Sequence, residues 1–345
     1  MMWTVLKSAK TTKKCIPIQV VAIASTLLFS NLGALGQTQP ITTPNIQSGG
    51  CEPIAKIIEG DRHWASLSKV CKSAQINPEP GGTVEVFCYL RGSILQVSAG
   101  TIGDKCLPLS TRERSGCSLQ NEHNCINIKG PNEDTDAPLR ITPYGVAIIN
   151  PRPMLSWVTT PGASSYIVQV EGIGVSWSLS VPNTRLPYPK DQPALQAGNV
   201  YDVNIIAKRG EKFIACQSLL VSVSEDRVQQ VATTIKRLQT FQESPDELAI
   251  DMDAVYNAQA LIDESIAVLS ARTKVSSQNP AIYRLLGERY LQGNSVFAAS
   301  SAYKSAIALA QKVNNPDELA LAEAGAKIAA ITQSQLLPTR IKPAQ

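Results

Sequence analysis

Histidine is nearly absent from this sequence of 345 residues, which contains only His63 and His123. Acid–base and nucleophilic catalysis rely on histidine more often than on other side chains. The sequence also lacks the GxSxG, HExxH and P-loop motifs and a glycine-rich dinucleotide fingerprint. Its closely spaced carboxylates, in "NEDTD" and "DMD", fall in an expected linker and on an expected helix face. We therefore expect no enzymatic activity, no catalytic residue and no cofactor.

A net charge of one sign is also missing from most of the chain. The formal charge is +4, and the four lysines Lys7, Lys10, Lys13 and Lys14 account for it. From Gln37 onward the chain has 28 basic and 28 acidic side chains. No basic patch remains to attract phosphates, so we expect no nucleic-acid partner.

The first 36 residues have the pattern of a secretory signal peptide. The four lysines precede the apolar run "CIPIQVVAIASTLLFSNLGALG", and Ala34 and Gly36 supply small residues for cleavage after Gly36. The alternative is an uncleaved membrane anchor, because Cys15–Leu35 has about the 20 residues needed to cross a bilayer. Under either interpretation the bulk of the chain is exported, and we expect the protein in the periplasm or cell envelope.

Seven cysteines follow the expected cleavage site, and six of them cluster within 51–125. An even cluster in an exported segment predicts a disulfide framework. The six candidates are Cys51, Cys71, Cys88, Cys106, Cys117 and Cys125. Six cysteines allow 15 pairings. We favour Cys88 with Cys106, because the expected strands "TVEVFCYL" and "ILQVSAG" place them on neighbouring segments.

Two further interpretations concern the cysteines. The stretch "CSLQNEHNC" brings Cys117, His123 and Cys125 close together, but the spacing matches no common zinc pattern, and we expect no metal. We expect Cys216 to be a small buried residue, with a redox or intermolecular role as the alternative.

Short strands with Gly and Pro turns predict a Cys-rich β domain over 51–129, after a flexible linker at 37–50. The stretch "VEVFCYLRGSILQVSAGTIGDKCLP" resembles the small FecR-like β modules of exported proteins. The polar, turn-rich run "GPNEDTDAP" indicates a second linker over 130–140.

Alternating apolar residues in "YIVQV", "WSLSV" and "YDVNIIA" predict a β-sandwich over 141–224. This segment resembles a fibronectin type III domain. The resemblance implies that Trp157 in "LSW" is the buried tryptophan of an early strand and that Tyr201 is the tyrosine-corner residue. Trp177 is expected to pack inside the sandwich, and the alternative is an exposed aromatic surface for a glycan or peptide.

Residues 225–335 predict a helical domain, and 336–345 a flexible tail. Glycine and proline become rare, and Val228, Val231, Ile235 and Leu238 recur at helical spacing. "SPDELAIDMDAVYNAQ" begins with a serine cap and a first-turn proline, and "NPAIYRLLGERYLQ" and "NPDELALAEAG" begin similarly. A partial last helix is expected at Leu321–Ile331.

A period of 34 residues links these helices, since Tyr256 precedes Tyr290, and Leu269 precedes Tyr303, by that distance. The spacing resembles the tetratricopeptide repeat, a 34-residue helix pair. Small residues at Gly287 and Ala299 let paired helices approach, and tyrosines fill the remaining gaps. The residues assigned to repeat packing are Tyr256, Tyr283, Leu286, Gly287, Tyr290, Ala299, Tyr303 and Ala306.

The repeat resemblance implies that Arg284, Glu288 and Gln292 line the concave face and form a partner groove. The alternative is a solvated stripe with one weak Arg–Glu pair. The positions of the large residues are structural in either case, so only these three side chains remain for recognition.

The order of modules resembles a group of exported cyanobacterial proteins with a Cys-rich FecR-like β domain, a fibronectin type III-like domain and C-terminal tetratricopeptide-like repeats. The expected fold class is multidomain α+β. We expect a non-enzymatic interaction protein that binds a protein or peptide through its helices, and contacts the membrane only through an uncleaved signal. The alternatives are an envelope polysaccharide-binding module that uses the β domains and an anchored FecR-like signalling protein.

Overall fold

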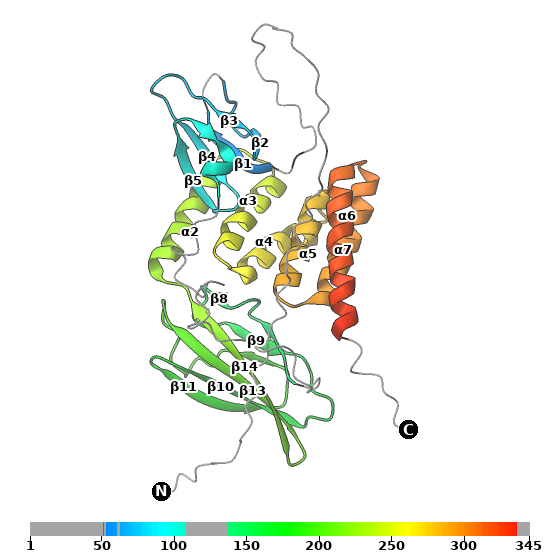
Figure 1. Cartoon of the computed structure of the whole chain (residues 1–345). Coiled ribbons are helices and arrows are strands. Elements are labelled where there is room, and N and C mark those ends of the chain that lie inside the picture. The colour runs from blue at the N-terminus through cyan, green and yellow to red at the C-terminus, as the bar shows by residue number, and fades with distance from the viewer. Residues whose placement is uncertain (1–50, 52, 61–62, 108–136, 337–345) are drawn as a thin grey trace. The chain divides into compact units, whose positions relative to one another are not determined.

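The computed structural model is a mixed α+β protein, with β-sheets first and helices last (Figure 1). The described chain falls into two compact units. The smaller unit holds the described residues up to Leu107 except Leu90–Ser93, and the larger unit holds those four and the residues from 137 onward. The structure describes residues 51, 53–60, 63–107 and 137–336.

The smaller unit is built on a four-stranded sheet whose strands follow the order β2-β1-β4-β5. The strands are β1 (Pro53–Glu59), β2 (Lys69–Cys71), β4 (Val84–Cys88) and β5 (Ser93–Val97). A short ribbon of β3 (Gln75–Ile76) and β6 (Gly100–Thr101) leads into the single-turn helix α1 (Ile102–Lys105). Aliphatic side chains from the sheet and from α1 form one buried core around Val86, Ile76 and Ile102.

Two disulfides tie the ends of these strands together. Cys51 is bonded to Cys71 at the end of β2, with the two Cα atoms 6.1 Å apart. Cys88 at the end of β4 is bonded to Cys106, with a Cα–Cα distance of 5.1 Å, which is the pairing favoured from the sequence. Disulfides persist in oxidising compartments, so both bridges indicate an exported protein. Two other expected disulfide residues, Cys117 and Cys125, lie outside the described residues.

The larger unit begins with two sheets packed face to face. The five-stranded sheet has the order β11-β10-β13-β14-β8, and the three-stranded sheet has the order β12-β9-β7. The former contains β8 (Ala147–Ile148), β10 (Ser165–Gly172), β11 (Val175–Val181), β13 (Val200–Arg209) and β14 (Lys212–Ser222). The latter contains β7 (Arg140–Thr142), β9 (Met154–Trp157) and β12 (Arg185–Pro187). Alternate residues of the long strands are buried, as their sequence pattern predicts.

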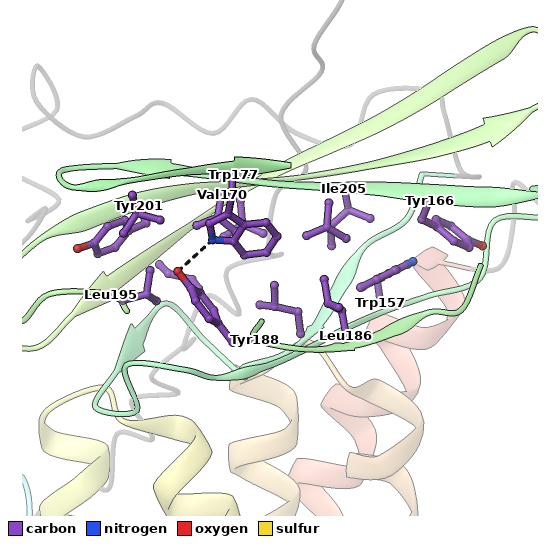
Figure 2. Close-up of a cluster of buried hydrophobic side chains, with 14 of the residues drawn as sticks. Trp157, Tyr166, Val170, Trp177, Leu186, Tyr188, Leu195, Tyr201 and Ile205 are labelled. Carbon is purple, nitrogen blue, oxygen red and sulfur yellow. Dashed lines mark hydrogen bonds between the residues drawn. The ribbon is translucent and has the colours of Figure 1, made fainter. Parts of the chain in front are cut away.

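Aromatic side chains fill the space between the two sheets (Figure 2). Trp157 is buried, as expected, and packs edge to face on Tyr166 at a centroid distance of 5.4 Å. The Tyr201 hydroxyl accepts a 2.7 Å hydrogen bond from the backbone N–H of Gln196, five residues upstream. Trp177 is also buried, and its indole Nε1 donates to the Tyr188 hydroxyl at 3.0 Å. Trp177 therefore presents no exposed aromatic surface, and that alternative is wrong.

Cys216, in the middle of β14, corrects a second expectation. It is buried, but it is disulfide-bonded and does not act as a free apolar side chain. The other four described cysteines are bonded to one another, so its partner lies outside the described residues. Burial alone therefore does not explain why a cysteine occupies this position.

The segment after β7 joins the sandwich to the helices within the larger unit. The Asp263 carboxylate accepts a 2.8 Å hydrogen bond from the Tyr144 backbone N–H, and the Tyr144 ring packs edge to face on Tyr290. Arg140 supports this segment by donating to the carbonyls of Pro143 and Gly145. Burial lowers the pKa of Arg140 to about 10, with nearby Asp263 acting in the opposite direction, so the guanidinium stays charged at neutral pH.

Six helices complete the larger unit, and consecutive helices pack against each other from α2 to α7. They are α2 (Glu225–Leu238), α3 (Pro245–Ala258), α4 (Ile262–Lys274), α5 (Pro280–Gln292), α6 (Val296–Lys312) and α7 (Pro316–Leu336). The last helix extends five residues beyond the expected Leu321–Ile331 at each end, and at its start the Asn315 side chain accepts a hydrogen bond from the Glu318 backbone N–H.

The two disulfides give the first testable prediction. Replacing Cys88 and Cys106 together by serine should lower the free energy of unfolding of the smaller unit by about 3 kcal/mol, because the bridge restricts the unfolded chain. Peptide mapping without reductant should recover linked peptides for Cys88–Cys106 and Cys51–Cys71. Complete alkylation of these four cysteines without reductant would contradict the assignment.

Candidate functional site

The candidate functional site is the stack of helices α3 to α7, because it contains every residue that the sequence assigns to recognition. Three of these helices begin with proline, at Pro245, Pro280 and Pro316, which are 35 and 36 residues apart. The short α3–α4 and α5–α6 turns contain Ala260 and Asn294, both with positive φ and 34 residues apart. The same helix–turn–helix unit therefore recurs along the chain.

The repeating units are stacked so that their first helices lie side by side. Helix α5 contacts α3 on one side and α7 on the other, in addition to its sequence neighbours α4 and α6. Turns of three residues reverse the chain between α3 and α4 and between α5 and α6. The result is a layered array in which α3, α5 and α7 occupy equivalent positions.

Tyr303 determines how closely α5, α6 and α7 approach. Its side chain is buried, and its ring carbons lie 2.9–3.0 Å from where a Cβ atom on Gly287 would stand. A Cβ on Gly325 would be closer still, 2.3 Å from the nearest ring carbon. The ring therefore occupies space that only glycine leaves open on both neighbouring helices. The small residues Ala299 and Ala306 are fully buried on α6.

The remaining repeat-packing residues also lie in the interior or at its border. Leu286 is buried, whereas Tyr283 and Tyr290 are half-buried and pack against the same cluster of α3, α4 and α5 side chains. Tyr256 is half-buried near Glu264, and burial, followed by that carboxylate, raises the pKa of its hydroxyl. The environment of these side chains indicates packing and gives no evidence of a binding role.

The three groove candidates have different environments. Arg284 is 8% exposed, and its guanidinium contacts Glu288 at 2.6 Å and Glu318 on α7 at 2.7 Å. Glu288 is half-buried, and Gln292 is exposed at the end of α5. A partner would have to compete with two carboxylates for Arg284, whereas Gln292 is directly accessible.

A chain of ion pairs crosses the three equivalent helices. Arg289 on α5 binds Asp253 on α3 through two 2.8 Å hydrogen bonds, from Nε and Nη2 to the two carboxylate oxygens. Arg289 also lies 3.8 Å from Glu288, which in turn binds Arg284. Arg284 completes the chain by binding Glu318 through two hydrogen bonds. We call these five residues the ion-pair chain.

Electrostatics keep both arginines of the ion-pair chain charged. Burial alone would lower the pKa of Arg289, but Asp253 together with Glu288 more than offsets that effect and the pKa is raised. The same holds for Arg284, where the carboxylates of Glu318 and Glu288 offset the cost of burial. Both charges are therefore satisfied inside the protein, which is the arrangement expected of a structural clamp.

Sequence reasoning missed Asp253, Arg289 and Glu318 as partners in this array. One signal was present, because Arg284 and Glu318 are 34 residues apart, which is the length of the repeat. Lys312 and Gln278, whose side chains share a 2.9 Å hydrogen bond, have the same separation. Complementary polar side chains one repeat apart therefore predict contacts between neighbouring repeats.

A shallow hollow of about 630 Å³ lies over β9 and β12 of the sandwich. Its polar lining includes Thr142 and Ser156, whose hydroxyl oxygens are 2.7 Å apart and hydrogen-bonded to each other. Asp263 also lines the hollow, and burial raises the pKa of its carboxyl group. This carboxylate already accepts the Tyr144 N–H, so the hollow offers no arrangement that predicts a reaction.

The described residues contain neither a metal-binding cluster nor a membrane-spanning helix. Within the described ranges, no group of three His, Cys, Asp or Glu side chains could hold a metal ion. The metal alternative of Cys117, His123 and Cys125 lies outside these ranges, and His63 is exposed beside the buried Trp64. No described helix is long and apolar enough to span a bilayer, and the expected signal segment lies outside the described residues.

Neither a protein-family model nor a curated protein matches this sequence. The geometry of the helices is therefore the main guide to function.

The ion-pair chain gives the second prediction. Replacing Arg289 by methionine leaves the 2% exposed Asp253 side chain buried without its counter-ion, and should cost about 3–5 kcal/mol in the free energy of unfolding. Combining this change with Asp253→Leu should recover most of the loss, because no buried charge remains. Denaturant unfolding of the single and double variants measures both effects.

The control is the more exposed pair of Arg272 and Asp246, whose side chains are 27% and 22% exposed. Arg272→Met should cost less than about 1 kcal/mol, because water screens the remaining charge. Equal losses for Arg289→Met and Arg272→Met would show that burial does not govern these pairs.

Proposed function

We propose that residues 141–224 form a fibronectin type III-like sandwich and residues 225–335 form tetratricopeptide-like repeats. Three observations support the first assignment: the three-plus-five arrangement of strands, antiparallel except where β8 pairs with β14, the buried Trp157 and the hydrogen bond to the Tyr201 hydroxyl. The 34–36-residue recurrence of helix starts and turns supports the second. We also retain the FecR-like assignment of the Cys-rich domain as a proposal.

On this basis, the protein is an exported, non-enzymatic interaction protein of the periplasm or cell envelope. The observation that carries the proposal is the stack of helix pairs, in which α3, α5 and α7 are equivalent and adjacent. Stacked pairs create an extended surface from successive helices, and such surfaces bind proteins and peptides. The sandwich acts as a spacer that holds the helices at a fixed point through Tyr144 and Asp263.

The binding surface includes the exposed Gln292 and the half-buried Glu288 on α5. Arg284 contributes indirectly, because it fixes the position of the Glu288 carboxylate with a 2.6 Å hydrogen bond. The accessible charge on this stretch is therefore negative, which favours a partner segment that carries a basic or hydrogen-bond-donating side chain.

The envelope polysaccharide alternative has less support. Its main candidate was Trp177, which is 7% exposed and hydrogen-bonded to Tyr188 inside the sandwich. The anchored FecR-like alternative depends on the N-terminal segment, which lies outside the described residues. The mature N-terminus, determined by mass spectrometry of the membrane and soluble fractions, separates cleavage from anchoring.

Crosslinking capture from envelope extracts tests the proposal. The full chain should capture a defined protein, and Gln292→Arg should weaken the capture roughly tenfold, as a bulky charge at a binding surface does. Ser301→Arg is the matched control, because Ser301 is also exposed but lies on the second helix of its pair. It should leave capture unchanged.

Two outcomes would contradict the proposal. Capture that is insensitive to Gln292→Arg and persists after removal of residues 225–345 would place recognition in the β domains. Saturable binding of an envelope polysaccharide by residues 37–224 would support the alternative function.

A further inference from the structure

Strand β11 forms an open edge of the sandwich. It is the outermost strand of the five-stranded sheet, and among the described residues it pairs along its whole length with β10 alone (Figure 1). Its outward-facing backbone N–H and C=O groups are therefore arranged as a template for another strand. The edge is seven residues long, from Val175 to Val181.

This edge lacks the features that usually prevent pairing between strands. Its sequence, "VSWSLSV", contains no charged residue and no proline. In the other sheet, the edge strand β12 has both an arginine and a proline within three residues, and β7 also has three residues and is followed by Pro143. The edge strand β8 has only two residues. Short strands, charge and proline protect an edge, and β11 has none of these protections.

The sequence of β11 is symmetric about its central residue, Ser178. Antiparallel pairing with an identical strand about this point places Val175 opposite Val181 and Trp177 opposite Leu179. The serines face one another in the same way, Ser176 opposite Ser180 and Ser178 opposite itself. Gly174 and Pro182, which flank the strand, are also equidistant from the centre.

The two faces of β11 match this symmetry. Val175 and Trp177 are buried in the sandwich core and Val181 packs against it, whereas the three serines are exposed on the other face. Leu179 lies on the same face of the strand as these core residues, yet it is 40% exposed. Symmetric pairing sets apolar residues opposite apolar residues and serines opposite serines, and it covers Leu179 with the Trp177 region of the second copy.

We propose that two copies of this chain associate by antiparallel pairing of β11 with β11 about a two-fold axis at Ser178. The pairing joins the two five-stranded sheets into one continuous sheet of ten strands. The interface is isologous: where a residue of one copy contacts a second residue of the other copy, the reverse contact is also made, and Ser178 contacts its own equivalent. The dimer presents two helical stacks, and so provides a second binding surface for a partner.

The contact is small compared with a standard protein interface of about 800 Å² per partner. We therefore expect a weak dimer with a dissociation constant in roughly the micromolar range. Sedimentation velocity of the purified protein between about 1 and 100 μM should show a concentration-dependent shift from monomer to dimer.

Replacing the exposed serines by charged residues tests the register of the β11–β11 pairing. The variant Ser176→Lys with Ser180→Lys sets lysines opposite lysines, and should raise the dissociation constant about tenfold or more. The corresponding variant Ser176→Glu with Ser180→Glu should behave similarly. An equimolar mixture of the two should dimerise at least as well as the unmodified protein, because each lysine then faces a glutamate.

The matched control adds two lysines at exposed positions elsewhere, Thr233→Lys with Ser301→Lys, and should leave dimerisation unchanged. Circular dichroism confirms that each variant is folded. If the double lysine variant unfolds, Ser178→Lys, which sets two lysines against each other at the axis, replaces it.

Three results would overturn the proposal. They are a purified protein that remains monomeric at 100 μM, a lysine variant that dimerises like the unmodified protein, and a mixture that fails to restore the dimer. A monomer whose β11 edge becomes protected from hydrogen exchange only when another protein is added would assign the edge to that protein's strand.

Discussion

The close contact between the Tyr303 ring and two glycines determines the geometry of the helical region. Gly287 and Gly325 lie on different helices, and a methyl group at either position would overlap the ring. The three helices can therefore approach this closely only with a tyrosine at 303 and glycines at 287 and 325. Because protein interiors are close-packed, such a contact fixes the separation of α5, α6 and α7 and, with it, the surface that they present.

The ion-pair chain adds orientation to this packing. The three carboxylates lie on α3, α5 and α7, at Asp253, Glu288 and Glu318. Their two arginine partners connect α3 to α5 and α5 to α7. A buried pair contributes little net stability, but it penalises any register in which a charge loses its partner. Packing therefore sets the distance between helices, and charge sets their alignment. Residues left outside both networks, such as Gln292, remain for recognition.

Local patterns predicted much of this fold. Alternation located β10 and β13, proline caps located α3 and α5, and the 34-residue period identified Gly287 and Tyr303 as packing residues. The sequence could not predict features that depend on contacts between distant segments. The disulfide of Cys216 and the Arg289–Asp253 pair are of this kind, because the sequence around each of these residues does not indicate its partner. The repeat position of Arg284 predicts a groove residue, whereas the structure pairs it with Glu318, and the 34-residue separation of the two is the one sequence signal for that contact.

Hydrogen–deuterium exchange of a Gly325→Ala variant tests the central claim most directly. If Tyr303 couples the helices, the added methyl group should displace the ring and increase exchange in α5 and α6 as well as in α7, while β10 and β13 of the sandwich remain protected. The free energy of unfolding of the helical region should fall by about 1–3 kcal/mol, as overpacking a core does. An increase in exchange confined to α7 would contradict the account, because the three helices would then not depend on a shared contact.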